Sequence, residues 1–292
     1  MEKIKIIAIV GTDRSGSTLL DKIISSNKGM FSVGEVHRYP YYLSENHECT
    51  CGRPFHDCEF WKSVLKQLKG NAFRPELTAI LGWRRRTGIL LGILACGKEY
   101  TRKKFREYAI ANATLLDAVR RESGANYIVD SSKDMTRIYL LHVSGLFDIY
   151  PIYITREVQD YALSLRTPQM KLDPHRETGP QKALLRWTFR NAETSFLLKA
   201  CFPKFVQISY GRFVNSPLKA IHGISKELGV RFDFDPDLVQ KTEYHFLGGN
   251  FMKFEKFSGI KPDTRDTAGV LDSIWSRPIV NALNHFFVRH NV

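Results

Sequence analysis

The chain has 292 residues, of which 43% are hydrophobic and 25% are charged. This composition is that of a globular protein, and it excludes a disordered, collagen-like or low-complexity chain. Because 43 Lys and Arg stand against 30 Asp and Glu, the formal net charge is +13. A surplus of this size favours an anionic partner, such as a nucleotide, a nucleic acid, an acidic polysaccharide or a lipid headgroup.

Membrane-spanning and targeting segments are not expected. The longest apolar run, from Gly88 to Gly97, is about half of the roughly 20 residues that span a bilayer. The N-terminal MEKIKIIAIV has only a short apolar stretch, and it is more typical of a buried strand than of a signal peptide. We therefore expect a cytoplasmic protein, or a lumenal one if an N-terminal anchor has been removed.

Short β-branched runs alternate along the chain with stretches of helical periodicity. Strands are predicted over 4–10, 127–130, 149–155 and 205–209, and they are nearly all apolar, as parallel strands covered on both faces are. The alternation predicts one three-layer αβα domain over 1–292 with a central, mainly parallel sheet. Between about residues 59 and 121 the periodicity is helical throughout, which predicts a helical insertion or lid.

A glycine-rich turn, GTDRSGST over 11–18, follows the first predicted strand and precedes a helix. Such a turn presents backbone N–H groups to an anion at the positive end of the helix dipole. The spacing is similar to that of a Walker A loop, but Ser17 occupies the position of the phosphate-binding lysine. Arg14 lies within the turn and can supply the missing cation from another direction. The sequence therefore predicts a phosphate-binding loop in a P-loop-like fold.

The loop resembles the 5′-phosphosulfate loop of the sulfotransferases that use 3′-phosphoadenosine 5′-phosphosulfate (PAPS). The resemblance is carried by R-S-G-S-T-L, the form found in tyrosylprotein and carbohydrate-type members. It implies that the 5′ end of PAPS is bound by Arg14, Ser15, Gly16, Ser17, Thr18 and Leu19.

A second part of the resemblance concerns the 3′-phosphate. In the family an Arg closes a strand, and a Ser follows eight positions later on the next helix. Here Arg156 follows the predicted strand 149–155, and Ser164 lies eight positions further on. An Arg can bind phosphate through two N–H groups, and a Ser adds a neutral donor. The ends of parallel strands are also where α/β proteins bind ligands.

Three further segments are similar to family motifs. The segment VDSSKD over 129–134 resembles one whose lysine, here Lys133, reaches the sulfuryl group. Tyr210 matches a tyrosine that helps to hold the adenosine, although Gly211 stands where the family has Glu. The segment HFLGGNFMK over 245–253 resembles a tail that covers the 3′-phosphate side, which implicates Gly249, Asn250 and Lys253.

The candidate general base lies in GEVHR over 34–38, which resembles the G-E-E-T-R segment of tyrosylprotein sulfotransferases. There the first Glu activates the acceptor hydroxyl, and Glu35 can do the same if desolvation raises its pKa toward neutrality. His37 is the rival, because phenol and steroid sulfotransferases use a His. On an extended segment both side chains would point to the same face. We prefer Glu35 as the base, with His37 shaping the acceptor pocket.

Three of the five cysteines form a cluster, Cys49, Cys51 and Cys58, in a segment that resembles one of bacterial PAPS-dependent members. Free or disulfide-linked structural cysteines are the favoured interpretation. The alternative is a Cys₃His zinc site with His47 or His56 as the fourth ligand, although C-x-C is tighter than the usual C-x₂₋₄-C spacing.

The resemblance implies transfer of the sulfuryl group from PAPS to an acceptor hydroxyl by in-line displacement, with no metal required. Arg14 and Lys133 would neutralise the charge on the leaving phosphate. The acceptor would be a carbohydrate, a lipid or another small molecule, acidic or sugar-containing. An aromatic platform for it could come from Tyr39, Tyr41 and Tyr42.

Two alternatives remain from the sequence. One is a P-loop nucleotide or small-molecule kinase, for which Asp130 is the only candidate carboxylate to hold Mg²⁺. The other is a non-catalytic module that binds an anion or a nucleic acid. We do not expect a nucleic-acid partner, because the sequence lacks an array of stacking aromatic residues on a basic strand.

Overall fold

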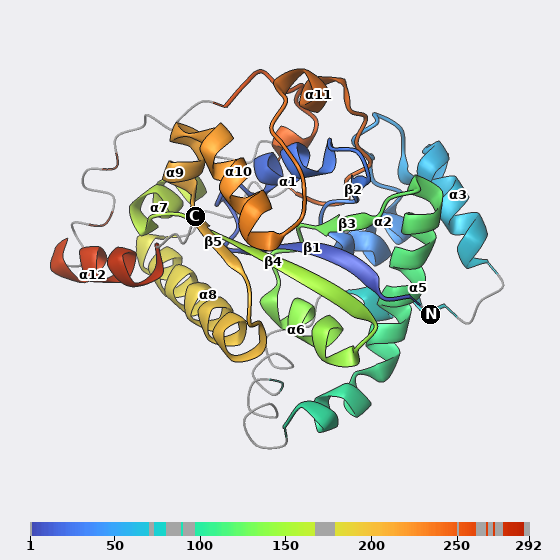
Figure 1. The fold of residues 1–292 in the computed structure, drawn as a ribbon, viewed down its shortest axis with the longest axis horizontal. Coiled ribbons are helices and arrows are strands. Elements are labelled where there is room, and N and C mark those ends of the chain that lie inside the picture. The colour runs from blue at the N-terminus through green and yellow to red at the C-terminus, as the bar shows by residue number, and fades with distance from the viewer. Residues whose placement is uncertain are drawn as a thin grey trace.

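Parallel strands form the centre of the molecule (Figure 1). The computed structural model describes residues 2–69, 73–79, 89, 97–166, 179–249, 251–260, 267, 271 and 277–288. Within these residues a five-stranded sheet has the order β2-β3-β1-β4-β5, and every pairing is parallel. The strands are β1 (Ile4–Gly11), β2 (Met30–Ser32), β3 (Tyr127–Asp130), β4 (Phe147–Thr155) and β5 (Val206–Ser209).

Helices cover both faces of the sheet. The side chains of β1 therefore alternate between two buried layers. Ile7 and Ile9 pack in the same cluster as α1 and α10, whereas Ile6 and Ala8 pack in the cluster that holds α5 and α6. The three-layer αβα fold with a parallel sheet is therefore confirmed. The helices nearest the sheet are α1 (Ser17–Ser25), α5 (Arg106–Ser123), α6 (Met135–Ser144), α8 (Pro180–Cys201), α9 (Tyr210–Asn215) and α10 (Pro217–Leu228).

The predicted strands agree with the structure to within two residues at each end. One strand was not predicted: β2 has only three residues, too few for a periodicity to show. It forms an edge of the sheet and pairs with β3, from Met30 opposite Tyr127 to Ser32 opposite Val129.

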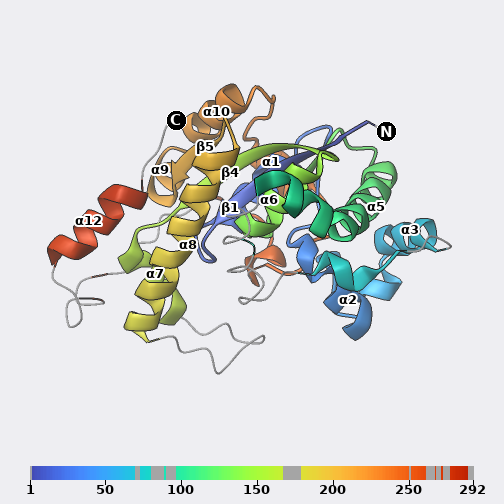
Figure 2. The ribbon, with the colours of Figure 1, turned by 90° about the horizontal axis from the view of Figure 1, so that it is seen from below.

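The predicted helical insertion is mainly helical where the structure describes it, apart from short turns and extended residues such as 73–74. It contains α3 (Glu59–Leu68), the 3₁₀ turn η3 (Pro75–Thr78) and most of α5, and α3 packs beside α5 (Figure 2). At the other end of the molecule α7 (Val158–Arg166) and α12 (Arg277–Phe287) both contact α8. Residues 70–72, 80–88 and 90–96 of the insertion lie outside the described residues. None of the helices described here is both long enough and apolar enough to span a bilayer.

The carboxylate of Asp21, on α1, is fully buried in the layer next to the sheet. Burial raises the pKa of Asp21 from its ordinary value of 3.8 to about 7, although the hydroxyls of Ser131 and Ser32 partly offset this effect. The folded state therefore holds a proton that the unfolded chain releases at lower pH. Because the folded state binds more protons in this window, stability falls as the pH rises from about 4 to about 7.

We expect Asp21→Asn to remove this loss. Relative to the native protein, the free energy of unfolding of the variant should rise by on the order of 3 kcal/mol between about pH 4 and about pH 8. Urea denaturation at the two pH values measures this change, with Asp148→Asn, an exposed carboxylate, as the control. A difference between variant and native protein that is the same at both pH values would contradict the prediction.

Candidate active site

A cavity of about 840 Å³ opens at the carboxyl ends of the strands. Its wall includes Gly11 at the end of β1, Lys133 after β3, Arg156 after β4 and Tyr210 after β5. After β1 the chain forms β2 and β3 on one side of it and later β4 and β5 on the other. Such a change of direction leaves a crevice outside the strand ends, where α/β proteins bind their ligands.

The phosphate-binding loop predicted over 11–18 forms the floor of the cavity. Gly16 adopts a left-handed φ of 88°, and a Cβ there would lie 2.5 Å from the ring of Tyr210, so only glycine fits. The helix α1 begins at Ser17, and its first turn lines the cavity with Ser17, Thr18 and Leu19. Ser15 is instead buried, and its hydroxyl donates to the carbonyl of Thr12 at 2.7 Å, which stabilises the loop.

The structure brings Arg14, Arg156, Ser164 and Tyr210 together. The Arg156 guanidinium donates to the carbonyl oxygen of Arg14 at 2.9 Å and lies 4.4 Å from the centre of the Tyr210 ring. Arg14 in turn donates to the carbonyl oxygen of Ser164 at 3.0 Å. The cation closing β4 is therefore in direct contact with the phosphate-binding loop, so one ligand could contact both.

Lys133 lies in the loop between β3 and α6, with a left-handed φ of 59°. Asp130 fixes this loop. One of its carboxylate oxygens accepts from the backbone N–H of Ser132 at 2.9 Å, and the other pairs with Arg137 at 3.1 Å. Arg137 is itself fully buried and also donates to Tyr108 on α5. The carboxylate that a kinase would use for Mg²⁺ thus serves to position the lysine loop.

Glu35 and Lys133 form an ion pair inside the cavity, through Oε1 of Glu35 and Nζ of Lys133. Burial opposes ionisation of Glu35, but the charge of Lys133, the neighbouring His37 and the hydrogen bond from Lys133 outweigh it. They lower the pKa of Glu35 to about 2. Desolvation therefore does not raise this pKa toward neutrality, which was the condition set for Glu35 as a base, because the sequence did not reveal the lysine that faces the carboxylate.

His37 also lines the cavity, with Nε2 at 3.9 Å from Oε2 of Glu35. The two residues do not lie on an extended segment, as the sequence analysis assumed. Glu35 instead precedes the 3₁₀ turn η1 (Val36–Arg38), which returns the imidazole toward the carboxylate. Burial lowers the pKa of His37 to about 4, so its imidazole is neutral near pH 7.

Sequence reasoning missed the cavity-lining cations Arg38, Arg186 and Arg190. The last two lie four positions apart on α8 and therefore face the same side of that helix. Arg186 pairs with Asp13 of the phosphate-binding loop at 3.0 Å. The i, i+4 spacing of Arg186 and Arg190 was the only signal in the sequence. It indicates a binding site only when α8 is known to lie beside the phosphate-binding loop.

The tail over 245–253 reaches the cavity only in part. Gly249 lines it, whereas Lys253 is buried outside the wall and donates to the hydroxyl of Tyr42 at 2.6 Å. Asn250 lies outside the described residues.

The predicted aromatic platform is not formed as a group of three. Of these tyrosines only Tyr41 lines the cavity, with 48% of its surface exposed. Tyr39 and Tyr42 are buried, and both pack against Phe55.

The three clustered cysteines are free thiols and do not form a disulfide. Neither histidine proposed as their zinc partner is placed to act. The ring of His47 lies 4.3 Å from that of Tyr41, and Nε2 of His56 lies 2.9 Å from the carbonyl oxygen of Leu43.

Comparisons with solved structures identify the fold. The chain is similar to the sulfotransferase domain from the olefin synthase of Synechococcus PCC 7002, with 20% sequence identity and a TM-score of 0.55. That match covers 100% of this chain and 98% of the other. The sulfotransferase domain from the curacin biosynthetic pathway is also similar, with 18% identity and a TM-score of 0.53 over 98% of this chain and 97% of the other. The sequence matches no protein-family model and no curated protein. The chain therefore has the fold of these sulfotransferase domains, which confirms the fold that the sequence resemblance implied.

Proposed function

We propose that the chain is a PAPS-dependent sulfotransferase that acts on a hydroxyl-bearing acceptor. The observation that carries this proposal is the pairing of the phosphate-binding loop with Arg156 across the carboxyl ends of β1 and β4, joined by the contact of Arg156 with Arg14. PAPS carries phosphate groups at its 5′ and 3′ ends, so a protein that binds it needs hydrogen-bond donors at two places. The loop would supply the first set and Arg156 the second. Among the residues that the structure describes, six cations line the cavity against two carboxylates, Asp13 and Glu35, which suits a polyanionic donor. These cations are Arg14, Arg38, Lys133, Arg156, Arg186 and Arg190.

In the proposed reaction the acceptor oxygen attacks sulfur as the bond from sulfur to the bridging phosphate oxygen breaks. The bonding pair leaves on that oxygen, as adenosine 3′,5′-bisphosphate, and the acceptor proton passes to Glu35. Lys133 would stabilise the leaving oxygen, on which negative charge grows during the transfer. A shift of Lys133 from Glu35 to that oxygen would also raise the pKa of Glu35, because burial would then be less opposed.

The acceptor would occupy the part of the cavity lined by His37, Arg38, Pro40, Tyr41 and Ala79. Tyr41 offers a ring face to a sugar or an apolar group, and Arg38, whose side chain is half exposed, offers a charge to an acidic substituent. An acceptor that is both hydroxylated and acidic fits these residues.

A kinase is the less favoured function, because both oxygens of Asp130 are engaged and Ser17 replaces the Walker A lysine. Isothermal titration calorimetry separates the two functions. Adenosine 3′,5′-bisphosphate should bind more tightly than ATP–Mg²⁺, and a panel of hydroxylated acceptors with radiolabelled PAPS should then yield a sulfated product. Tighter binding of ATP–Mg²⁺ would reject the sulfotransferase.

Arg156→Ala should weaken the binding of adenosine 3′,5′-bisphosphate by about 1.5–3 kcal/mol, since the variant loses hydrogen bonds to a charged phosphate. Adenosine 5′-phosphosulfate, which lacks the 3′-phosphate, should lose much less affinity. Ser164→Ala should cost less than Arg156→Ala, because its hydroxyl already donates to the carbonyl of Tyr161.

Calorimetry with both nucleotides checks this assignment. Arg212→Ala serves as a matched control, because that Arg is exposed on α9 and does not line the cavity. An equal loss for both nucleotides in Arg156→Ala would refute the 3′-phosphate role.

A further inference from the structure

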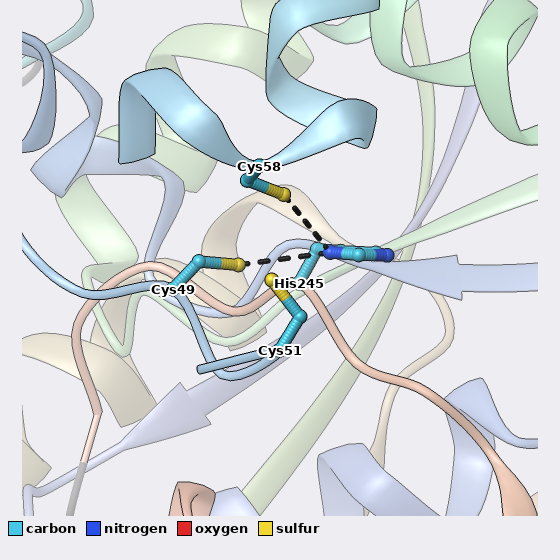
Figure 3. Close-up of side chains that lie close together, drawn as sticks. All are labelled: Cys49, Cys51, Cys58 and His245. Atoms are coloured by element: carbon cyan, nitrogen blue, oxygen red, sulfur yellow. Dashed lines mark hydrogen bonds between the residues drawn. The ribbon is translucent and has the colours of Figure 1, made fainter. Parts of the chain in front are cut away.

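Four potential metal ligands converge outside the cavity (Figure 3). Cys49 and Cys51 lie in the loop after α2 (Tyr39–Glu45), Cys58 directly precedes α3, and His245 belongs to the segment after α11 (Pro236–Lys241). The three Sγ atoms and one ring nitrogen of His245 all lie within 4.8 Å of one another. Nδ1 of His245 is 3.3 Å from Sγ of Cys58 and 3.6 Å from Sγ of Cys49.

We propose that these four side chains bind one structural Zn²⁺ ion. In a tetrahedral site with Zn–S of about 2.3 Å and Zn–N of about 2.0–2.1 Å, neighbouring sulfur and nitrogen atoms lie about 3.6 Å apart. The separations of 3.3 and 3.6 Å from Nδ1 fall close to this value. Cys49 and Cys58 are buried and the other two are half-buried. Four protein ligands would close the site to substrate, which is the pattern of structural rather than catalytic zinc.

The ring of His245 is held in the orientation that a metal ligand requires. It stacks on Phe60, with ring centres 4.9 Å apart and planes inclined by 11°. Nδ1 faces the sulfur atoms, while Nε2 lies 3.9 Å from a carboxylate oxygen of Glu243. An acidic group beside the second ring nitrogen favours the tautomer that leaves Nδ1 free to bind a metal.

Backbone contacts bring the two segments together at this point. Thr50, between the first two cysteines, donates its hydroxyl to the carbonyl of Tyr244 and accepts from the backbone N–H of Phe246 at 2.9 Å. The residues on both sides of His245 are thus bound to the cysteine loop. The fourth ligand comes from 187 positions after Cys58. Despite the tight C-x-C spacing, the Sγ atoms of Cys49 and Cys51 both lie within 4.8 Å of the other two ligand atoms.

The ion would connect the cysteine loop to the segment that supports the active site. Leu247, two residues after His245, donates its N–H to the carbonyl of Val33 at 2.6 Å and accepts from the N–H of Glu35 at 2.7 Å. Gly249 then lines the cavity. Zinc would therefore fix the backbone of Glu35 without contacting the reacting atoms. The site stands independently of the proposed sulfotransferase activity.

Metal analysis of the purified protein tests the proposal without an activity assay. Protein produced in zinc-containing medium should retain one zinc ion per chain after gel filtration, and a strong chelator should remove it and lower the Tm by several degrees. Cobalt(II) should replace zinc with the visible absorption of a tetrahedral thiolate site. Cys58→Ser and His245→Ala should lose the metal, whereas Cys201→Ser should retain it, because Cys201 is a buried thiol on α8 outside the cluster.

Native protein that folds without metal and takes up neither zinc nor cobalt(II) under reducing conditions would overturn the proposal. A disulfide between two of the three cysteines in the purified native protein would do the same. Should the ligand variants fail to fold, the metal content and chelator response of the native protein decide the question. A native protein that binds zinc but does not bind adenosine 3′,5′-bisphosphate would contradict the proposed function and leave the zinc proposal intact.

Discussion

Glu35→Gln should lower kcat by about a hundred- to ten-thousandfold, the usual effect of removing a positioned general base. The amide keeps the shape of the side chain and its place beside Lys133 but cannot accept the proton of the acceptor hydroxyl. Binding of adenosine 3′,5′-bisphosphate should stay nearly intact, because the predicted donor contacts lie in the phosphate-binding loop and at Arg156. Steady-state kinetics at saturating PAPS, with calorimetry for the nucleotide, separates the two effects.

Two further variants make this test specific. Glu59→Gln, an exposed carboxylate on α3, should turn over normally. His37→Ala should have a smaller effect than Glu35→Gln if the imidazole only shapes the pocket. Normal turnover of Glu35→Gln together with an inactive His37→Ala would make His37 the base, a role that its neutral imidazole near pH 7 allows.

The pH profile provides a second readout for Glu35. With its pKa lowered to about 2, the carboxylate is already ionised throughout the range in which the protein is assayed. Protonation of the free enzyme at Glu35 would reduce kcat/KM only near that value. The native kcat/KM should therefore show no acid limb from Glu35 between about pH 5 and about pH 8.

Lys133→Ala should lower kcat by roughly a hundredfold or more, the scale of losing one donor to a developing oxyanion. The bridging oxygen gains negative charge only as the S–O bond breaks, so the ammonium acts more on the transition state than on bound PAPS. Stopped reactions with radiolabelled PAPS give kcat and KM separately. A variant with normal kcat and only a raised KM would make Lys133 a binding residue.

Lys133→Ala also removes the cation that lowers the pKa of Glu35 most. Without that cation, the desolvation of Glu35 is less fully offset, so the pKa of Glu35 should rise. The pH profile of kcat/KM should then show an acid limb within the measurable range. Lys133→Arg should restore part of kcat and abolish this limb. Lys62→Ala, which removes an exposed lysine of α3, serves as the control and should change neither.

The sequence was most informative where the deciding interactions are local. A parallel strand covered on both faces is nearly all apolar, and β1, β3, β4 and β5 were each predicted on that basis. The glycine-rich turn over 11–18 was equally easy to place, because its glycines and the helix start lie within eight residues. The three-residue β2 escaped prediction for the converse reason, since it is fixed by its pairing with β3 and not by its own pattern.

By itself, then, the sequence determined the αβα fold and the position of the glycine-rich turn at the end of the first strand. Only the tertiary structure decided the charge state of Glu35, because the lysine that lowers its pKa lies 98 positions away. Likewise, only the tertiary structure showed that His245, and not His47 or His56, lies beside the cysteines. It also showed that Arg186 and Arg190 line the cavity. Periodicity and turn preferences depend on residues that are close together in the sequence, so they can be recognised from the sequence alone. Electrostatic and ligand contacts depend on distances through space, which are set only when the strands align and their carboxyl ends meet.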